Sequence, residues 1–151
     1  IDDAGKVSCI PTYRSLRLWP DSASAVMPAA SFEPMAADSY KRRLDLDETA
    51  PTGQSTVAAI CVLSAPEDAE AVTVSPLTPA RAVSLLLAQC FRFDPTNAEA
   101  TKRCFERCAD LSERVPIVEL SYPRDFSRLP EVRDMVLERC ASGDWTAITS
   151  G

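Results

Sequence analysis

The sequence predicts an α/β fold in which a mixed sheet is flanked by about three to four helices. Short apolar segments of strand length dominate the first half of the chain, and the second half carries helical periodicity interrupted by one further strand. Strands first, then helix, helix, strand and helix, is an order typical of layered α/β domains. The composition agrees, because 46% of the 151 residues are apolar and 25% are charged, as in ordinary globular proteins.

Strands are predicted where short apolar or alternating segments are bounded by turn residues. The first ones cover residues 6–10, 15–18, 41–47, 56–63 and 71–74. The run 56–63 is almost continuously apolar, so we expect it to form a buried central strand. One further strand is predicted over residues 116–123, which prolines bound at both ends.

Prolines mark the starts of two predicted helices. Pro20 directly follows the strand 15–18, and Asp21 adds a carboxylate to the first turn, where the helix dipole favours it. Thr78 is expected to cap the next helix, with Pro79 at its first position. Each proline therefore fixes the point at which an extended segment becomes helical.

Two more helices are predicted by the spacing of apolar residues. One runs from about 97 to 114, and the last begins near Pro130 and stops at Gly143. Its inward-facing side chains are expected to be Val132, Met135, Val136 and Cys140. Residues 1–142 are accordingly expected to form one domain, followed by a peripheral tail over 143–151.

The charge balance argues against nucleic acid and membrane as partners. Sixteen basic and 22 acidic side chains give a net charge of −6, which would repel both polyanions. No run approaches the roughly 20 apolar residues of a membrane span, and the N-terminus lacks the layout of a signal peptide. The expected location is the cytoplasm, and the opening "IDDAGKV" suggests a fragment cut within a hairpin.

Several kinds of catalytic site are excluded by the residues present. The chain has no histidine, which excludes a Ser-His-Asp hydrolase and disfavours a thiol protease. The phosphate-loop lookalike "PTGQST" lacks the lysine of a Walker A loop and leads into a strand, so we interpret it as a turn. Asp125 follows a predicted strand but is more typical of a turn or helix cap.

Six cysteines are expected to be mainly buried free thiols, because cysteine behaves as a small hydrophobic residue. The chain has no CxxC motif and no paired ligand spacing, so no metal site is predicted. A four-cysteine zinc site remains the minor alternative. It would use Cys90, Cys104, Cys108 and Cys140.

The candidate binding residues are the basic run in "YKRRLD". Arginine forks match phosphate oxygens bidentately, so Lys41, Arg42 and Arg43 could contact a phosphate or an acidic substrate. Alternation along a strand places Lys41 and Arg43 on one face and Arg42 on the other, so at most two of them share a site. The alternative is a solvated edge strand protected by basic side chains. Arg17 is a weaker candidate on a neighbouring strand.

An ordered set of segments resembles the C-terminal half of HPr kinase-like proteins, serine kinases with a core similar to that of phosphoenolpyruvate carboxykinase. The segments are "LRLWPDSA", "KRRLDLD", "VAAICVLSAPED", "VSPLTPARAVSLLLAQCFRF" and "VPIVELSYPRDFSRLPEV". Together they extend from about residue 5 to residue 140, nearly the whole chain. The resemblance implies the C-terminal portion of a kinase core.

The resemblance also implies what this chain does not contain. The family's GxxxxGK[ST] loop and its Asp-Asp pair would lie upstream of Ile1, so the catalytic residues are expected there and this chain is not expected to act alone. The intact parent would transfer a phosphoryl group from ATP with Mg²⁺ to a serine of a small protein or peptide. This chain would contribute Lys41, Arg42, Arg43 and Arg17 to substrate or phosphate contact, and no cofactor of its own.

Alternatives remain at this stage. The chain could be a non-catalytic module that binds a peptide or regulatory partner, or a subunit that pairs with a separate nucleotide-binding chain. In the kinase interpretation, the corner "LWPDS" would pack the second half of the domain against the nucleotide-binding half, with Arg17 at the seam. The acceptor, the direction of transfer and a homo-oligomeric state are not determined by the sequence.

Overall fold

The computed structural model describes residues 6–10, 15–34, 39–46, 53–90, 96–146 and 149–150. The chain divides into two compact units: Ile1–Ser8 with Thr56–Gly151, here called the larger unit, and Cys9–Ser55, the smaller unit. The described residues form four α-helices and three sheets, so the mixed α/β class predicted from the sequence is confirmed. None of these helices has the length and apolar character needed to cross a lipid bilayer.

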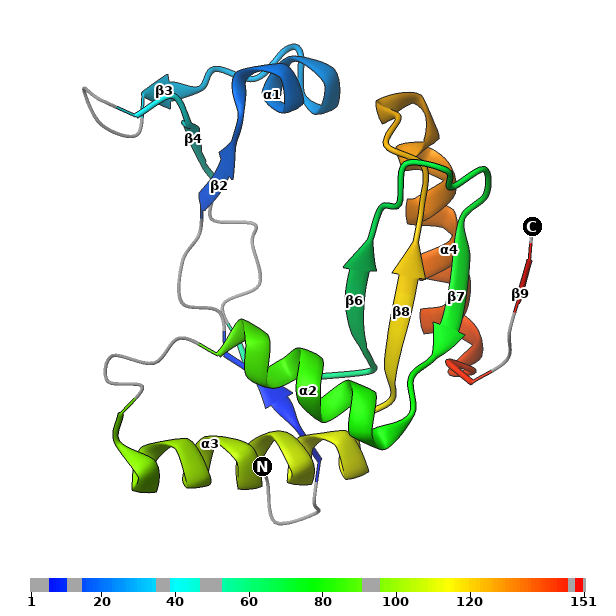
Figure 1. Cartoon of the computed structure of the whole chain (residues 1–151). Helices are drawn as coiled ribbons and strands as arrows, with labels where there is room; N and C mark the ends of the chain where they lie inside the picture. The colour runs from blue at the N-terminus through cyan, green and yellow to red at the C-terminus, as the bar shows by residue number, and fades with distance from the viewer. Residues whose placement is uncertain are drawn as a thin grey trace. The chain divides into compact units, whose positions relative to one another are not determined.

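The larger unit is built on a four-stranded mixed sheet with the order β6-β8-β7-β9. Its strands are β6 (Ile60–Ser64), β8 (Ile117–Ser121), β7 (Thr73–Pro76) and β9 (Thr149–Ser150). β6 runs parallel to β8, and β7 is antiparallel to both β8 and β9. Figure 1 shows β6, β8 and β7 side by side, with β8 between the other two.

β6 lies at the edge of this sheet, which corrects the prediction of a central strand over 56–63. Among the described strands it pairs with β8 alone, and its Leu63 side chain is 65% exposed. The central position belongs to β8, whose Val118 is 1% exposed. A continuous apolar run signals burial but does not specify strand order, because order is set by which segments find partners.

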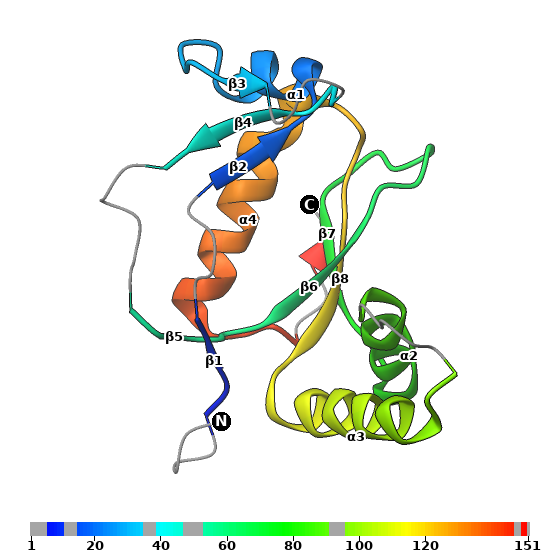
Figure 2. The same ribbon diagram turned by 90° about the vertical axis from the view of Figure 1, so that its left-hand side faces the viewer.

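Three helices surround this sheet. α4 (Leu129–Ser142) lies against one face, and α2 (Pro79–Gln89) and α3 (Ala98–Arg114) lie together at the end where β7 ends and β8 begins (Figures 1 and 2). A short 3₁₀ turn, η1 (Phe126–Arg128), precedes α4. This arrangement attaches the α2–α3 pair to the two strands that form the centre of the sheet.

Local residues explain where these helices begin and end. The Asn97 side chain accepts a hydrogen bond from the Ala100 amide at 2.9 Å, which caps α3. Gly143 has φ +70° immediately after α4, a conformation that glycine adopts without steric cost. Thr78 occupies the N-cap position of α2, as predicted, but its hydroxyl makes no capping hydrogen bond.

The core of the larger unit joins β7, β8 and the segment after α4. Its buried members are Val72, Val74, Val118, Leu120 and Trp145. Trp145 is 4% exposed, although the sequence places it in a segment expected to be peripheral. Its large apolar ring returns to the sheet once Gly143 has reversed the chain, and tail composition alone does not reveal this.

α4 presents a different inward face from the one predicted. Val132, Met135 and Val136 pack against the core as expected, but Cys140 is exposed. Arg139 is buried instead, and its Nη1 donates a hydrogen bond to the Asp144 carbonyl at 2.7 Å. The aliphatic part of an arginine side chain can cover apolar surface once its guanidinium has partners. A prediction based on hydrophobicity alone therefore chose Cys140 instead of Arg139 as the buried residue in the last turn of α4.

The smaller unit contains a three-stranded antiparallel sheet with the order β2-β4-β3. Its elements are β2 (Ser15–Leu18), α1 (Pro20–Val26), β3 (Glu33–Pro34) and β4 (Arg42–Asp45). Pro20 starts α1 with Asp21 in its first turn, as predicted. A short pair of strands, β1 (Ser8–Cys9) and β5 (Ser55–Thr56), stands where the chain passes from one unit to the other.

The buried position of Trp145 generates a stability prediction. Trp145→Ala is expected to lower the free energy of unfolding by about 3–5 kcal/mol, because loss of a buried ring leaves a cavity. Chemical denaturation followed by circular dichroism would measure this change. The matched control is Trp19→Ala, whose ring is 53% exposed and whose loss should cost about 1 kcal/mol or less. Equal effects of the two substitutions would contradict the core assignment.

Candidate functional site

The predicted basic residues lie on the sheet of the smaller unit. Arg43 on the central strand β4 pairs with Arg17 of β2 on one side and with Glu33 of β3 on the other. Like charges directly opposite one another on a sheet repel, so this row needs a compensating anion. Glu33 supplies one from the strand opposite. Asp45 supplies a second, because it lies two residues along β4 from Arg43 and therefore on the same face.

The Arg43–Asp45 contact is bidentate. Nε and Nη2 of Arg43 donate to the two carboxylate oxygens of Asp45 at 2.8 and 2.6 Å. The hydrogen bond raises the pKa of Arg43 and lowers the pKa of Asp45 from their ordinary values. Both side chains are about half exposed, so the pair adds little stability. Its main effect is that the fork of Arg43 is already occupied.

Lys41 lies against an aromatic ring. Its Nζ is 5.3 Å from the centroid of the Trp19 ring, within the range of a cation–π interaction. Trp19 is 53% exposed and the neighbouring Tyr40 is 82% exposed. The exposed Trp19 ring and Lys41 are here together called the Trp19 patch.

Arg42 occupies a different setting from its neighbours. It lines a hollow of about 210 Å³ together with residues of α1 and of the segment that follows it. The other lining residues are Pro20, Ala23, Ser24, Met27, Pro28, Ala30 and Phe32. Arg42 is exposed, and no hydrogen bond or ion pair joins its guanidinium to another described residue.

The structure therefore separates the four predicted residues. Arg17 and Arg43 lie opposite each other in the strand register, and Lys41 reaches Trp19. Arg42 pairs with Leu18 in the strand register and lines the hollow beside α1. Four cations thus do not converge on one site, and Arg42 is the arginine among them whose guanidinium makes no hydrogen bond or ion pair within the described part of the chain.

A second hollow lies at the carboxyl ends of the parallel strands β6 and β8, the position where α/β proteins commonly bind ligands. Its volume is about 380 Å³, and its lining includes Ala65, Tyr122, Arg124 and Asp125. Arg124 Nε donates to the Ala65 carbonyl at 2.8 Å, and Asp125 accepts from the Ser127 amide at 2.8 Å. That amide lowers the pKa of Asp125. Asp125 is thus a capping residue, as the sequence indicated.

Arg124 was not singled out in the sequence, although its place directly after the predicted strand 116–123 was a usable signal. Its guanidinium closes the gap between the ends of β6 and β8 by binding backbone 59 residues away. This contact holds the two strand ends together. In this hollow, the Arg124 guanidinium is therefore bound to backbone and the Asp125 carboxylate caps a helical turn. Both groups have structural roles and do not form an acid–base pair.

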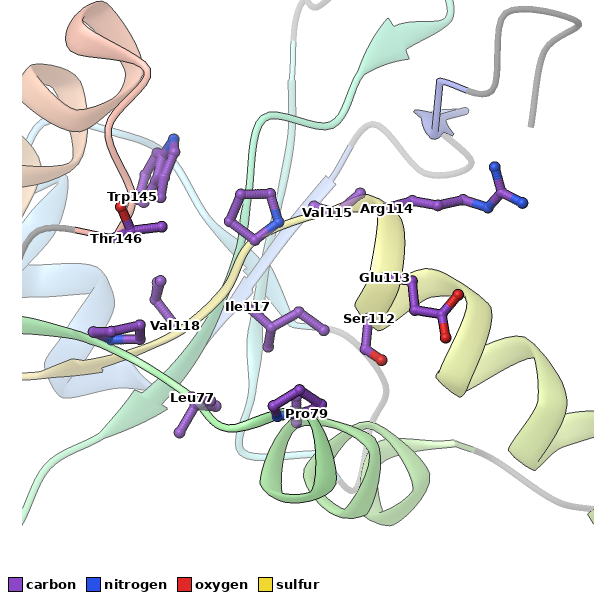
Figure 3. Close-up of a pocket in the computed structure, with 13 residues that line it drawn as sticks. Leu77, Pro79, Ser112, Glu113, Arg114, Val115, Ile117, Val118, Trp145 and Thr146 are labelled. Atoms are coloured by element: carbon purple, nitrogen blue, oxygen red, sulfur yellow. The ribbon is translucent and has the colours of Figure 1, made fainter.

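A third hollow, of about 300 Å³, lies between the start of α2, the end of α3 and the segment after α4. Figure 3 shows Leu77, Ile117 and Val118 around it, with Trp145 and Thr146 on one side. Arg114 extends away from the cavity, and its Nε binds Asp110 at 2.7 Å. The lining is mainly apolar, which suits packing better than catalysis.

Three cysteines converge in the α2–α3 pair. Cys90, directly after α2, has its Sγ 3.7 Å from Sγ of Cys108 on α3, and all three sulfur atoms of Cys90, Cys104 and Cys108 lie within 4.8 Å of one another. Burial, with help from the neighbouring thiols, raises the pKa of Cys108 to about 12. The exposed Cys140 is not a member of this group, which corrects the four-cysteine alternative.

Comparison of the chain with protein-family models, with curated proteins and with solved structures finds no match.

The cysteine group generates a prediction about thiol reactivity. In reduced, chelator-treated protein at pH 8, iodoacetamide should modify the exposed Cys9 and Cys140 first and the buried Cys108 last. Because the raised pKa keeps Cys108 protonated, its rate should continue to increase about tenfold per pH unit beyond pH 9, towards its pKa of about 12. Peptide mass spectrometry of timed samples measures the order. Modification of Cys108 as fast as Cys140 would contradict it.

Proposed function

We propose that this chain is the back portion of an HPr kinase-like, ATP-dependent serine kinase, and that Arg42 contacts phosphate or the acidic part of the substrate. The observation that carries the proposal is the position of Arg42: an exposed guanidinium that lines a hollow and has no partner among the described residues. The ordered resemblance of the segments in the sequence supplies the family.

The chemistry of phosphoryl transfer suits such a residue. Negative charge spreads over the oxygens of the transferred group, so catalysis relies on positioning and on cations placed near that charge. An arginine fork can donate to two phosphate oxygens at once. Arg43 is a poorer candidate because Asp45 already holds its Nε and Nη2.

The proposal places no nucleotide or Mg²⁺ site in the described residues. Among them, cysteines make up the one cluster of three or more potential metal ligands, and sulfur is a poor ligand for Mg²⁺. The segment "PTGQST", whose first two residues lie outside the described residues, lacks the lysine of a phosphate loop. The proposal therefore assigns ATP and Mg²⁺ to a preceding half of the protein, and leaves binding and orientation of substrate to this chain.

The open edge of the larger unit's sheet supports a partner of this kind. β6 pairs with β8 on one side, and no described strand covers its other side. Leu63 on this edge is 65% exposed, and unpaired apolar edges favour association with a further strand. A nucleotide-binding half could continue the sheet there, whether it belongs to the same polypeptide or to a separate chain.

The second candidate is a non-catalytic module that binds a peptide. The Trp19 patch favours it, because an exposed tryptophan beside a lysine is typical of surfaces that bind other chains. The two candidates differ in what they require. The kinase needs ATP and yields a phosphoserine, whereas the module binds its peptide without either.

Arg42→Gln tests the proposal. In the longer polypeptide that includes the nucleotide-binding half, this change should lower the transfer of phosphate from ATP to a serine peptide by about 10-fold or more, since a charge-assisted hydrogen bond contributes roughly 1.5–3 kcal/mol. Thermal stability should remain unchanged, because Arg42 has no described partner to lose. Mass spectrometry of the peptide measures the transfer.

The matched control is Arg43→Gln, which removes the same charge one residue away and should reduce transfer less. Unchanged transfer in the Arg42→Gln, Arg43→Gln double variant would show that the basic strand is merely solvated. ATP-independent peptide binding, with no phosphoserine formed, would support the module instead.

Trp19→Ala tests the proposed contact with the preceding half. Trp19 is 53% exposed in this chain, so the substitution should change its own stability little. In the longer polypeptide the same change should lower the melting temperature by several degrees, because the ring would be buried there. Differential scanning calorimetry of both proteins measures the contrast. An unchanged melting temperature in the longer protein would remove the proposed packing role.

A further inference from the structure

The cysteine group of Cys90, Cys104 and Cys108 has the features of a ligand set rather than of scattered core thiols. Two helices contribute to it: Cys90 ends α2, and Cys104 and Cys108 lie one turn apart on one face of α3. Every pair of sulfur atoms in the group lies within 4.8 Å. The three cysteines are separated by 14 and 4 residues in sequence, so their convergence depends on the packing of α2 against α3.

The sulfur spacing is close to that of a metal–thiolate site. Zn²⁺ binds thiolates at about 2.3 Å with tetrahedral geometry, which separates two sulfur ligands by about 3.8 Å. The Cys90 and Cys108 sulfur atoms are 3.7 Å apart. Contraction of the other spacings by less than about 1 Å, within the reach of side-chain rotation, would bring all three sulfur atoms onto one ion.

The chemistry of the three sulfur ligands also favours a soft cation. Thiolates select Zn²⁺ and similar thiophilic ions over Mg²⁺ and Ca²⁺, which need oxygen ligands. One turn before Cys104 on the same face of α3, the hydroxyl of Thr101 is buried and has no hydrogen-bond partner among the described residues. Hydroxyls in this position can donate to a thiolate or to a metal-bound water, as outer-shell donors do in metal sites.

We propose that Cys90, Cys104 and Cys108 bind one Zn²⁺ ion as three thiolates, with a water or an added thiol at the fourth position. With water as the fourth ligand, binding converts three thiols and one Zn²⁺ into a complex of net charge −1 and releases three protons; an added thiol, bound as a thiolate, makes the charge −2 and releases a fourth proton. Neither case changes an oxidation state. The ion links the end of α2 to the middle of α3. This site is independent of the proposed kinase function.

The alternative state of the same group is a disulfide. The 3.7 Å between the sulfur atoms of Cys90 and Cys108 makes this pair the natural one to oxidise, which would leave Cys104 as a lone thiol. Zinc binding and oxidation compete for the same sulfur atoms. They differ in a measurable way, because oxidation removes two hydrogens and needs an oxidant, whereas zinc binding needs reduced thiols.

The test uses the reduced 151-residue chain, titrated with Zn²⁺ in competition with a chromogenic chelator. One equivalent should bind, and Zn²⁺ should raise the melting temperature because it binds the folded form. Changes to outer-shell groups already cost roughly 10- to 100-fold in metal affinity, so Cys90→Ser or Cys104→Ser should each cost about 100-fold or more. Cd²⁺ should add a sulfur-to-metal charge-transfer band that both variants weaken.

The control is the triple variant Cys9→Ser, Cys61→Ala, Cys140→Ser, which keeps the cysteine group and should bind Zn²⁺ like the parent. Circular dichroism without metal checks that each variant is folded; if Cys104→Ser unfolds, Cys90→Ser at the helix end gives the answer. Failure of the reduced parent to bind a stoichiometric ion, or equal binding by the Cys90→Ser variant, would overturn the proposal. So would a Zn²⁺ affinity lost in the triple control and retained in the two group variants.

Discussion

The antiparallel pairing of β7 with β8 is the constraint on which most of the larger unit depends. Val74 and Val118, from these two strands, are almost completely buried, and a slip of one residue would turn such side chains towards water. The ladder continues past β7, since the Leu77 amide donates to the Ile117 carbonyl at 3.1 Å. α2 begins two residues later and α3 ends just before β8, so this register fixes where both helices attach. The meeting of Cys90 with Cys108 is therefore a consequence of strand register.

In the smaller unit, the central position of β4 determines which charged side chains lie next to one another. A strand with neighbours on both sides presents each side chain to two others, and this gives Arg43 both Arg17 and Glu33 as cross-strand partners. Repulsion between the two arginines is offset by Asp45 on the same face. The alternate residue, Arg42, has apolar Leu18 and Pro34 as its partners in the register. Its guanidinium consequently has no nearby carboxylate with which to pair.

Local features of the fold could be predicted from the sequence, and the features that depend on distant contacts could not. The strand 15–18, the helix start at Pro20 and the helix stop at Gly143 depend mainly on residues close by in the sequence. All three predictions are confirmed. The edge position of β6 and the burial of Trp145 depend on which strands pair and where the chain returns, and no local pattern encodes this. For the basic run, alternation was sufficient to separate Arg42 from Arg43, and the i, i+2 spacing to Asp45 was an available signal for their pairing. The cysteine group had no such signal beyond the spacing of Cys104 and Cys108, because its third member comes from another helix.

The hollow lined by Arg42 and the cysteine group differ in the charge of their side chains. This difference affects which kind of ligand each can bind. Arg42 carries a permanent charge at an exposed position, so an anion that it binds remains partly in water and the interaction weakens with added salt. Cys108 is buried, and burial keeps its thiol neutral until a cation compensates for the lost protons. A metal ion bound to the proposed cysteine site would supply this compensating positive charge and would link the end of α2 to α3. An exposed arginine suits a substrate that must bind and leave, whereas a buried thiolate site suits an ion that stays, so a transient role in the smaller unit and a structural one in the larger unit are compatible in one chain.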